Sequence, residues 1–338
     1  MCRVSGPTIA DIARAAEVST ATVSHALNGT GRLAESTRRR VREIATGLGY
    51  GSYRAPRTRN LGLAVTTFAG SAWNFVAVHY FSQWLTAATS AAHARGYALT
   101  TLPADRGAGT PWHTLSVDGM LLLDSPRGDP VLRALRARGI PVVFDGRPAD
   151  PRPGDIWVDN DHAATTREVL DHLAEAGARR IALHGGLGDE YYTYAVTRAY
   201  EQWCAERGHP PLLIPCDPDD APGHAFDRAF DRAPGARADA DAVDAVYSLY
   251  EPGGRQVLAA AARHGLRVPD ELLLVCASED PAYAQGDPAV STVTLRPGVI
   301  GENAVAALVA LLESPRDTVP GQLTVPAGLT VRASSGGF

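Results

Sequence analysis

The sequence predicts two unlike folding units in series: an all-α helix-turn-helix headpiece at the N-terminus and a larger α/β body with parallel sheets. Three observations lead to this prediction. The chain has 338 residues, more than a single core of ordinary size holds. Apolar side chains recur at helical spacing through the first fifty residues. From Leu61 onward, apolar strand-like runs alternate with helical segments, which is typical of parallel β-α-β units.

The headpiece is expected to contain two short helices and a third, supporting helix. Thr8 stands before an apolar stripe and can cap the first helix, and Ser19 can cap the second. The third helix is expected from about Ser36 to Gly47. Two short helices joined by a three-residue turn form the helix-turn-helix plan. The inward apolar positions are Ile9, Ile12, Ala13, Ala16, Val23, Ala26, Leu27, Val41, Ile44, Ala45 and Leu48.

The outward face of the second helix carries short side chains that can enter a DNA major groove without clashing. They are Thr20, Ala21, Ser24, His25 and Asn28. A plain three-helix bundle with a solvated polar face would show the same spacing. Spacing alone therefore leaves both interpretations open.

The body is expected to begin at Leu61 and to consist of strands connected by alanine-rich helices. The expected strands are Leu61–Thr66, Ala98–Leu102, Gly119–Leu123, Val142–Phe144, Ile156–Val158, Ile181–His184, Ala245–Ser248 and Leu272–Cys276. The expected helices are Phe81–Arg95, Asp161–Ala176, Val196–Arg207 and Gly253–His264. The Asp-rich stretch Asp217–Asp244, with His224, has no ligand periodicity and is expected to be a solvated loop region.

Composition and charge narrow the classes of function. Residues 1–60 carry ten Arg and four acidic residues, whereas the rest carries 22 Arg and 33 acidic residues. A basic end on an acidic body favours a polyanion as the partner of the headpiece. No run approaches the ~18 apolar residues of a membrane span, and no signal-peptide core is present, so we expect a cytoplasmic protein without a membrane partner. The cysteines lack metal-ligand spacing, and we expect reduced thiols and no metal or cofactor: Cys2, Cys204, Cys216 and Cys276.

The segment from Thr8 to Asn28, TIADIARAAEVSTATVSHALN, resembles the headpiece of the lac-repressor-type (LacI/GalR) transcription regulators. The pattern of that family runs TIxDVAxxAGVSxxTVSRxLN. Residues 36–38 and 47–50 are similar to the family's third helix and its end. The chain departs from the pattern at Glu17, where the family usually has Gly, and at His25, where Arg is usual.

The resemblance implies that Thr20, Ala21 and His25 read the bases of a double-stranded, pseudo-palindromic DNA operator. It also implies that a set of small polar side chains and one arginine contact phosphates. These are Thr8, Ser19, Thr22, Ser24, Asn28, Arg32 and Thr37. Since a histidine cannot make the bidentate contact to guanine that an arginine makes, base preference at His25 should differ from, or be weaker than, that of an Arg-bearing relative.

Residues 51–60 are expected to form a basic linker between the headpiece, residues 1–50, and the body, residues 61–338. Pro56 opposes a helix here, and the family's hinge helix, with its minor-groove Leu, has no counterpart. Two interpretations remain open for Arg54, Arg57 and Arg59. They are either a flexible arm on phosphates or the minor groove, or a solvated tether.

Six stretches of the body resemble the effector domain of the same family, which is built like a type I periplasmic sugar-binding protein. They are residues 117–122 (VDGMLL), 139–143 (GIPVV), 158–160 (VDN), 177–182 (GARRIA), 265–270 (GLRVPD) and 329–334 (LTVRAS). The resemblance implies two Rossmann-like subdomains with a small-molecule effector, a sugar or similar compound, in the cleft between them. It also implies a homodimer held together through the body.

By position in the family pattern, the effector cleft should be lined by carboxylates, an arginine and aromatic rings, which suit a polyhydroxylated ligand. The expected residues are Phe75, Asp124, Asp159, Arg198, Tyr250, Glu251 and Glu279. Three departures from the family's cleft residues indicate either an unusual small ligand or a lost effector response. They are Val196 at the arginine position, Tyr250-Glu251 for Asn-Asp and Glu279-Asp280 for Asp-Asp.

No catalytic constellation was found, so we expect no enzyme: the glycines at 185–188 lack the Lys-Ser/Thr of a phosphate loop. The preferred interpretation is a cytoplasmic, nucleoid-associated regulator, a repressor controlled by an effector. The alternatives are an effector-independent DNA-binding regulator with a degenerate pocket, or a sugar-binding module related by fold only.

Overall fold

The chain folds into two compact units, Met1–Thr58 and Arg59–Phe338, called the headpiece and the body below. The computed structural model describes residues 8–28, 31, 33–47, 58–66, 75–102, 116–186, 188–217, 223–230, 242–313 and 321–336. Three helices make up the described headpiece, namely α1 (Ile9–Ala15), α2 (Thr20–Asn28) and α3 (Glu35–Gly47). Their shared core is formed by the predicted inward residues, among them Ile12, Val23 and Val41, each with no exposed surface.

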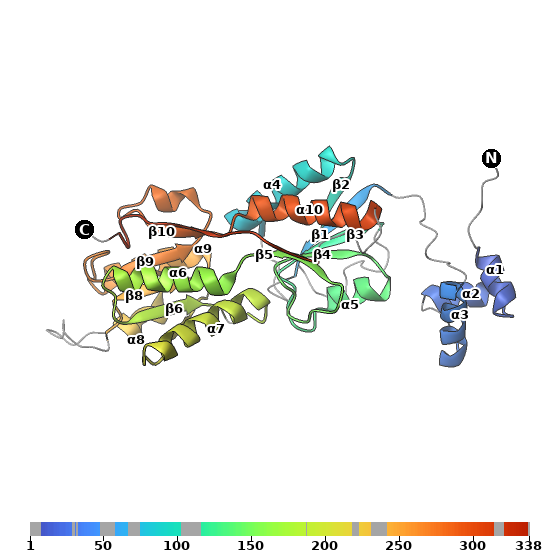
Figure 1. Ribbon diagram of the computed structural model, residues 1–338, viewed down its shortest axis with the longest axis horizontal. Coiled ribbons are helices and arrows are strands. Elements are labelled where there is room, and N and C mark those ends of the chain that lie inside the picture. The colour runs from blue at the N-terminus through green and yellow to red at the C-terminus, as the bar shows by residue number, and fades with distance from the viewer. Residues whose placement is uncertain are drawn as a thin grey trace. The chain divides into compact units, whose positions relative to one another are not determined.

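The body contains two six-stranded sheets (Figure 1). The first has the order β11-β5-β4-β3-β1-β2 and is entirely parallel; the second has the order β12-β10-β9-β8-β6-β7 and is parallel except for β12. The first sheet consists of β1 (Asn60–Val65), β2 (Ala98–Leu102), β3 (Gly119–Leu123), β4 (Val142–Asp145), β5 (Ile156–Asp159) and β11 (Gln322–Thr324). The second consists of β6 (Ile181–Gly185), β7 (Leu213–Pro215), β8 (Ala245–Ser248), β9 (Leu273–Ala277), β10 (Ser291–Thr294) and β12 (Gly328–Thr330).

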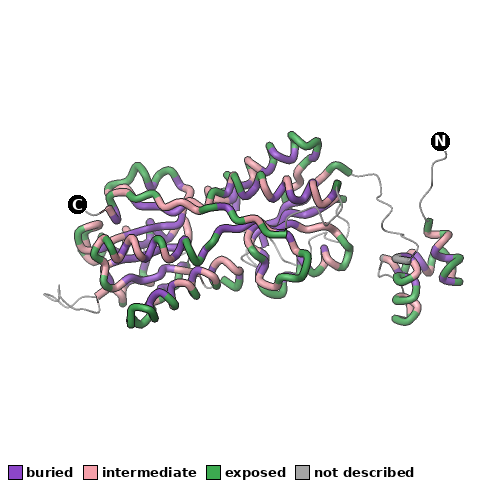
Figure 2. The backbone as a smooth tube through the Cα atoms, viewed as in Figure 1, coloured by how far each residue is buried: buried purple, intermediate pink, exposed green. Residues whose placement is uncertain are grey.

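Helices cover both faces of each sheet. We call the first sheet with its helices the first subdomain, and the second sheet with its helices the second subdomain. The first subdomain has η1 (Phe75–Ala77), α4 (His79–Ala94), α5 (Pro130–Ala137) and α10 (Pro297–Glu313). The second has α6 (His162–Glu175), α7 (Tyr191–Glu206), η2 (His224–Phe226), α8 (Asp227–Phe230), α9 (Glu251–Arg263) and η3 (Pro281–Ala284). Because side chains alternate along a strand, Leu61 and Leu63 of β1 face the core under α4 and α10, whereas Ala64 faces α5. Figure 2 shows the resulting buried sheets and the exposed outer faces of the helices.

The chain passes between the two subdomains three times: after β5, after β10 and after β11. One side chain joins the three crossings. Asn160, which is 7% exposed, donates from Nδ2 to the carbonyl oxygens of Leu295 (3.1 Å) and Val325 (2.8 Å). The three crossing segments are thus tied together at a single amide.

The predicted α/β organisation is confirmed, and the expected strands at 98–102, 119–123 and 245–248 have the observed bounds of β2, β3 and β8. Four short strands, β7, β10, β11 and β12, were not expected. Helix α7 begins at Tyr191, five residues before the predicted start. Leu48 and the linker residues 51–57 lie outside the described residues.

The prediction of a solvated loop over Asp217–Asp244 is wrong for its described middle part. This part forms η2 and α8, and Phe226 and Phe230 are buried there against the face of the second sheet that α9 covers. Their rings stack with centroids 5.1 Å apart. Burial of these two aromatic side chains holds the segment against the sheet, although its acidic composition suggested a loop. The three described cysteines are buried free thiols, as expected: Cys204, Cys216 and Cys276.

Candidate functional site

Side-chain caps hold the first two helices of the headpiece in the arrangement that the sequence predicts. Thr8 caps α1 with a capping box: its hydroxyl accepts from the amide of Asp11 (3.3 Å), and the Asp11 carboxylate accepts from the amide of Thr8 (2.8 Å). The Ser19 hydroxyl accepts from the amide of Thr22 at 3.0 Å at the start of α2. Thr8, Ser19 and Thr22 therefore have a structural role in addition to any contact with phosphates.

The second helix presents the predicted base-reading residues to solvent. Thr20, Ala21 and His25 are exposed, whereas Val23 and Ala26 on the opposite face are fully buried. The two helix faces differ because the buried residues recur at a spacing of three. This arrangement leaves a short polar surface on a rigid helix, which is what entry into a major groove requires.

Two residues that the sequence analysis missed hold the end of α2. Arg38 of α3 donates to the carbonyl oxygens of His25 (3.3 Å) and Gly31 (3.2 Å). Gly31 has φ 72°, and a Cβ there would lie 2.9 Å from Nδ1 of His25. The imidazole of His25 thus packs against a backbone that only glycine supplies, so Gly31 and Arg38 position a predicted base reader.

The turn between α1 and α2 holds Glu17 in a left-handed conformation, with φ 52°. The amide of Glu17 donates to Arg14 (3.3 Å) and the amide of Val18 donates to Ala13 (3.0 Å), which is the Schellman pattern that ends helices at glycine. The only described ion pair of Glu17 is an exposed one with Arg40 at 3.8 Å. Nothing in the turn compensates for placing a side chain at this position.

Replacing Glu17 with Gly should stabilise the headpiece by about 1 kcal/mol, because glycine adopts a positive φ without steric cost. We expect headpiece amides to exchange about fivefold more slowly in hydrogen-exchange mass spectrometry of the full chain. E17A removes the Arg40 ion pair but keeps the strained conformation, so it serves as the control and should change little. Equal protection in E17G and E17A would show that the backbone conformation is not the cause.

Other predicted DNA contacts can be placed only in part. Ser24 and Thr37 are half-buried on α2 and α3. Arg32, Arg54 and Arg57 lie outside the described residues, as does the side chain of Asn28. Arg59 belongs to the body, where its amide donates to Asp118 (2.9 Å) and its guanidinium lies 5.2 Å from the Tyr97 ring. These contacts do not fit Arg59 as part of a free arm.

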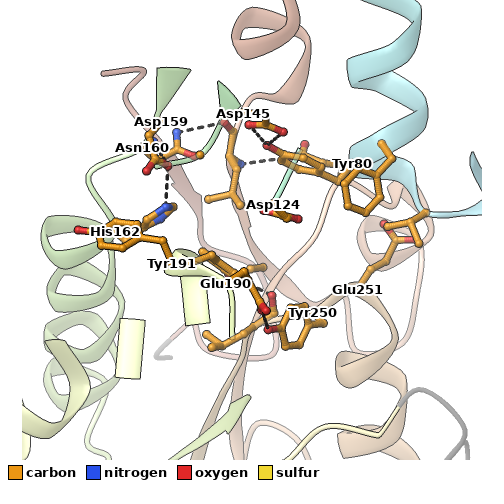
Figure 3. Close-up of a pocket in the computed structure, with 18 of the residues that line it drawn as sticks. Tyr80, Asp124, Asp145, Asp159, Asn160, His162, Glu190, Tyr191, Tyr250 and Glu251 are labelled. Atoms are coloured by element: carbon orange, nitrogen blue, oxygen red, sulfur yellow. Dashed lines mark hydrogen bonds and ion pairs between the residues drawn. The ribbon is translucent and has the colours of Figure 1, made fainter. Parts of the chain in front are cut away.

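A cavity of about 110 Å³ lies between the two subdomains (Figure 3). It is lined by Val78, Tyr80, Phe81, Asp124, Asp145, Gly146, Arg147, Asp159, Asn160, His162, Glu190, Tyr191, Tyr192, Leu249, Tyr250, Glu251, Ala277, Ser278, Glu279 and Leu295. Five of the seven predicted cleft residues are in this set: Asp124, Asp159, Tyr250, Glu251 and Glu279. The structure therefore brings together residues that are far apart in sequence.

The structure does not bring the other two predicted cleft residues to the cavity. Phe75 is buried in the core of the first subdomain, edge-to-face against Phe81 with centroids 6.2 Å apart. Arg198 lies on the outer face of α7, where its side chain is 68% exposed and 3.9 Å from Glu201. The turn of α7 directs Val196, not Arg198, into the core.

Three aspartates stand at the carboxyl ends of adjacent parallel strands of the first sheet. Asp124 follows β3, Asp145 ends β4 and Asp159 ends β5. In parallel sheets these ends meet at one edge, where ligands commonly bind. Asp124 adopts φ 51°, a conformation that aspartate tolerates better than most residues.

The second subdomain contributes carboxylates that are held by hydrogen bonds. Tyr250 Oη donates to Glu190 at 2.9 Å, and Thr193 donates to the same carboxylate. The Glu279 carboxylate accepts from the Thr294 hydroxyl (2.8 Å) and from the amide of Leu295 (2.8 Å). Since Leu295 is at the second crossing, a group bound at Glu279 would be linked directly to a segment that connects the two subdomains.

Burial and mutual repulsion raise the pKa of the strand-end carboxyls. Burial, followed by the charges of Glu190 and Asp159, raises the pKa of Asp124 from 3.8 to about 8. Burial also holds the pKa of Asp145 well above its ordinary value, with the charge of Asp124 adding to the effect, although the Tyr80 hydroxyl donates to both oxygens of Asp145 at 2.9 and 3.0 Å. The cavity thus holds protons on carboxyl groups near neutral pH.

Contacts across the cavity connect the two subdomains. His79 Nδ1 lies 2.8 Å from Glu251 Oε1, and the Arg147 guanidinium lies 4.8 Å from the Tyr191 ring. Among the described residues, one group has ligand atoms close enough to hold a metal, namely His79, Glu251 and Asp280. The members of this group already contact other protein groups: Glu251 and His79 contact each other, and Asp280 pairs with Arg255. We therefore interpret the group as a hydrogen-bonded contact between subdomains.

Two family models match the chain. One, described as "Bacterial regulatory proteins, lacI family", matches residues 8–52, and one described as "Periplasmic binding protein-like domain" matches residues 170–335. Among curated proteins, the HTH-type transcriptional regulator CelR of Thermobifida fusca is 27% identical over 338 residues (96% of this chain, 95% of CelR). The HTH-type transcriptional repressor PurR of Aliivibrio fischeri (strain MJ11) is 26% identical over 327 residues (89% of this chain, 90% of PurR).

Solved structures give the same result for the fold. The chain resembles a transcriptional regulator CelR–cellobiose complex with a TM-score of 0.68 and 25% identity, covering 97% of this chain and 99% of that one. It resembles the lac repressor dimer bound to operator and the anti-inducer ONPF with a TM-score of 0.66, covering 98% and 99%; at 18% identity this likeness concerns the fold alone. These relatives are transcription regulators, not enzymes. Within the described residues, no helix has the length and apolarity to cross a membrane.

Proposed function

Because the chain belongs to the LacI family of bacterial regulatory proteins, we propose that it is a homodimeric repressor acting on DNA in the cytoplasm, with no catalytic activity of its own. Two headpieces read a pseudo-palindromic operator, and a small molecule, a sugar or similar compound, binds the cavity and controls affinity. One observation supports this proposal most directly. The same chain has an exposed polar face on α2 and a cavity whose walls come from both subdomains.

The residues of the body supply a physical route for control. A ligand that contacts Asp124 and Asp159 on one side and Tyr250 and Glu279 on the other favours one relative orientation of the subdomains. That orientation changes at the crossings that Asn160 ties together. Because binding at two sites is coupled reciprocally, a ligand that prefers one orientation changes operator affinity, and the operator changes ligand affinity.

Selection of bound sequences from a random DNA pool with the full-length chain tests the DNA-binding part of this proposal. We expect a two-fold symmetric consensus, because a symmetric dimer places two identical headpieces on the duplex. Equal binding to every sequence in the pool would contradict a sequence-specific regulator. Strong dependence of affinity on salt is expected in either case and does not discriminate.

Replacing His25 with Ala should weaken binding to the selected operator by about tenfold or more, because the dimer loses one hydrogen bond of roughly 0.5–1.5 kcal/mol in each half-site. Selection with H25A should lose base preference at one position in each half-site and keep the rest. His93 is exposed on α4 of the body, so H93A is a matched control and should leave both measurements unchanged. An unaltered consensus with H25A would exclude His25 as a base reader.

A further inference from the structure

The cavity has a strong excess of acidic over basic side chains. Six carboxyl groups line it: Asp124, Asp145, Asp159, Glu190, Glu251 and Glu279. The lining bases are Arg147 and His162. His162 lies 2.7 Å from Asp159, and Arg147 stacks between the rings of Tyr191 and Trp157 at 4.8 and 5.9 Å. Among the described residues, no ion pair joins Arg147 to any of the six carboxyls.

Three tyrosine hydroxyls of the lining already donate within the protein. The hydroxyls of Tyr80 and Tyr250 donate to Asp145 and Glu190, and that of Tyr192 donates to the Leu249 carbonyl at 3.1 Å. Ionised carboxylates only accept hydrogen bonds. Once the carboxyls are ionised, they outnumber the donors that remain on Arg147, Tyr191 and Ser278, so a ligand that supplies more donors than acceptors fits the cavity better.

Asp124 is the carboxyl with the least compensation. Glu190 and Glu251 stand at the N-termini of α7 and α9, where the helix dipole favours negative charge, whereas Asp124 and Asp145 stand at strand ends. No hydrogen bond or ion pair joins the Asp124 side chain to the rest of the described chain, and its carboxyl faces the cavity (Figure 3). The charged or titratable groups around it are Tyr80 of α4, Asp145 of β4, Asp159 of β5, Glu190 before α7, Tyr192 of α7 and Tyr250 before α9.

We propose that the cavity binds a small organic cation, a molecule with a protonated amine that lies against Asp124 and Asp145. An ammonium group carries three donors and a positive charge, which matches a set of acceptors that lacks a cation. The aromatic side chains of Tyr80, Phe81, Tyr191, Tyr192 and Tyr250 line the same cavity, and aromatic rings attract cations. This inference rests on the proposed ligand control and narrows its ligand from sugars in general to amines, such as an amino sugar or a linear polyamine.

A neutral sugar fits the arrangement less well. Each sugar hydroxyl brings acceptor lone pairs together with its donor, and none of them offsets the repulsion between Asp124, Asp159 and Glu190. A cation also lowers the free energy of the ionised form of Asp124, so its binding should release a proton at pH 6.5. A neutral ligand lacks this effect.

Isothermal titration calorimetry of the full-length chain can compare glucosamine, N-acetylglucosamine, glucose and spermidine at pH 6.5. We expect glucosamine or spermidine to bind at least about tenfold more tightly than either neutral sugar, because a hydrogen bond between charged groups is stronger than one between neutral groups. The first three probes share a ring and differ in the amine, and spermidine distinguishes a polyamine from an amino sugar. Titration in two buffers of different ionisation enthalpy measures the expected proton release.

Two variants test the assignment to Asp124. D124N should reduce amine affinity about tenfold or more and reduce the proton release, leaving the part that comes from Asp145, whose pKa is also raised. E201Q removes a carboxylate from the outer face of α7 and should change neither. If only the neutral sugars bind, or if no amine binds, the proposal of a cationic ligand is wrong. Neutral sugars that bind and change operator affinity would leave the proposed ligand control intact, so the two failures are distinguishable.

Discussion

Substituting Asp124 with Asn is expected to stabilise the unliganded chain by on the order of a few kcal/mol at pH 8 and by little near pH 4. Unfolded Asp124 ionises near its ordinary pKa of 3.8, whereas the folded protein retains the proton up to about pH 8. Between these values the unfolded state has released a proton that the folded state still holds. The stability of the wild-type chain therefore falls as pH rises through this window.

Urea unfolding from pH 4 to pH 9 measures this effect, with body fluorescence as the signal because all five tryptophans follow residue 58. The stability curve of D124N should decline less than that of the wild type, with a residual slope from Asp145, whose pKa is also raised. E201Q, at an exposed carboxylate, should follow the wild-type curve. Parallel curves for D124N and the wild type would contradict an uncompensated charge at Asp124.

A gain of stability that lowers ligand affinity would identify Asp124 as a residue kept for binding. Binding sites commonly retain groups that destabilise the empty protein, because those groups gain partners only when the ligand arrives. The positive φ of Asp124 is consistent with this view, since strained conformations concentrate at such sites.

Replacing Asn160 with Ala should lower the free energy of unfolding of the body by about 2–4 kcal/mol, because two hydrogen bonds are lost and the Leu295 and Val325 carbonyls lose a donor. N160D should cost more than N160A at pH 7. The aspartate has nearly the same shape, but it sets a carboxylate against two carbonyl oxygens. This order distinguishes the loss of a donor from the loss of packing.

The measurement is urea unfolding of full-length variants at pH 7. Asn303 of α10 makes a local hydrogen bond to Val299 at 2.9 Å, so N303A is a matched control with an expected change of at most about 0.5 kcal/mol. If N160A and N303A had the same small effect, Asn160 would not hold the crossings together.

Much of the fold could be predicted because its signals are local. Strand β3 is a continuous apolar run and β8 is apolar up to its last residue, which is the pattern of buried parallel strands. The strands that escaped prediction are short or half-polar. β10 (STVT) is stabilised by the buried hydroxyl of Ser291, and β12 pairs with it in antiparallel register across the 33 intervening residues 295–327. Such pairing depends on distant partners and leaves little trace in the sequence.

The cavity residues that stand at the ends of strands could be predicted from the sequence. Asp124 and Asp159 were expected from their positions in the family pattern. The sequences LLLD, VVFD and IWVD each end an apolar run with an aspartate, so a rule based on strand ends would have found Asp145 as well. Arg198 was misplaced because two residues along a helix change the direction of a side chain by about half a turn. Glu190 precedes α7, whose start was predicted five residues too late, whereas His162 opens α6, whose start was predicted within one residue. Their position at the cavity depends on packing between subdomains.

The most direct test of the account is the affinity of the full-length chain for its selected operator, measured by fluorescence anisotropy with and without the ligand identified by calorimetry. Coupling between cavity and headpiece predicts a change in Kd of about fivefold or more at saturating ligand, in either direction, and a much smaller change for D124N at the same concentration. A ligand that saturates the cavity while operator affinity stays the same would contradict ligand control of this regulator.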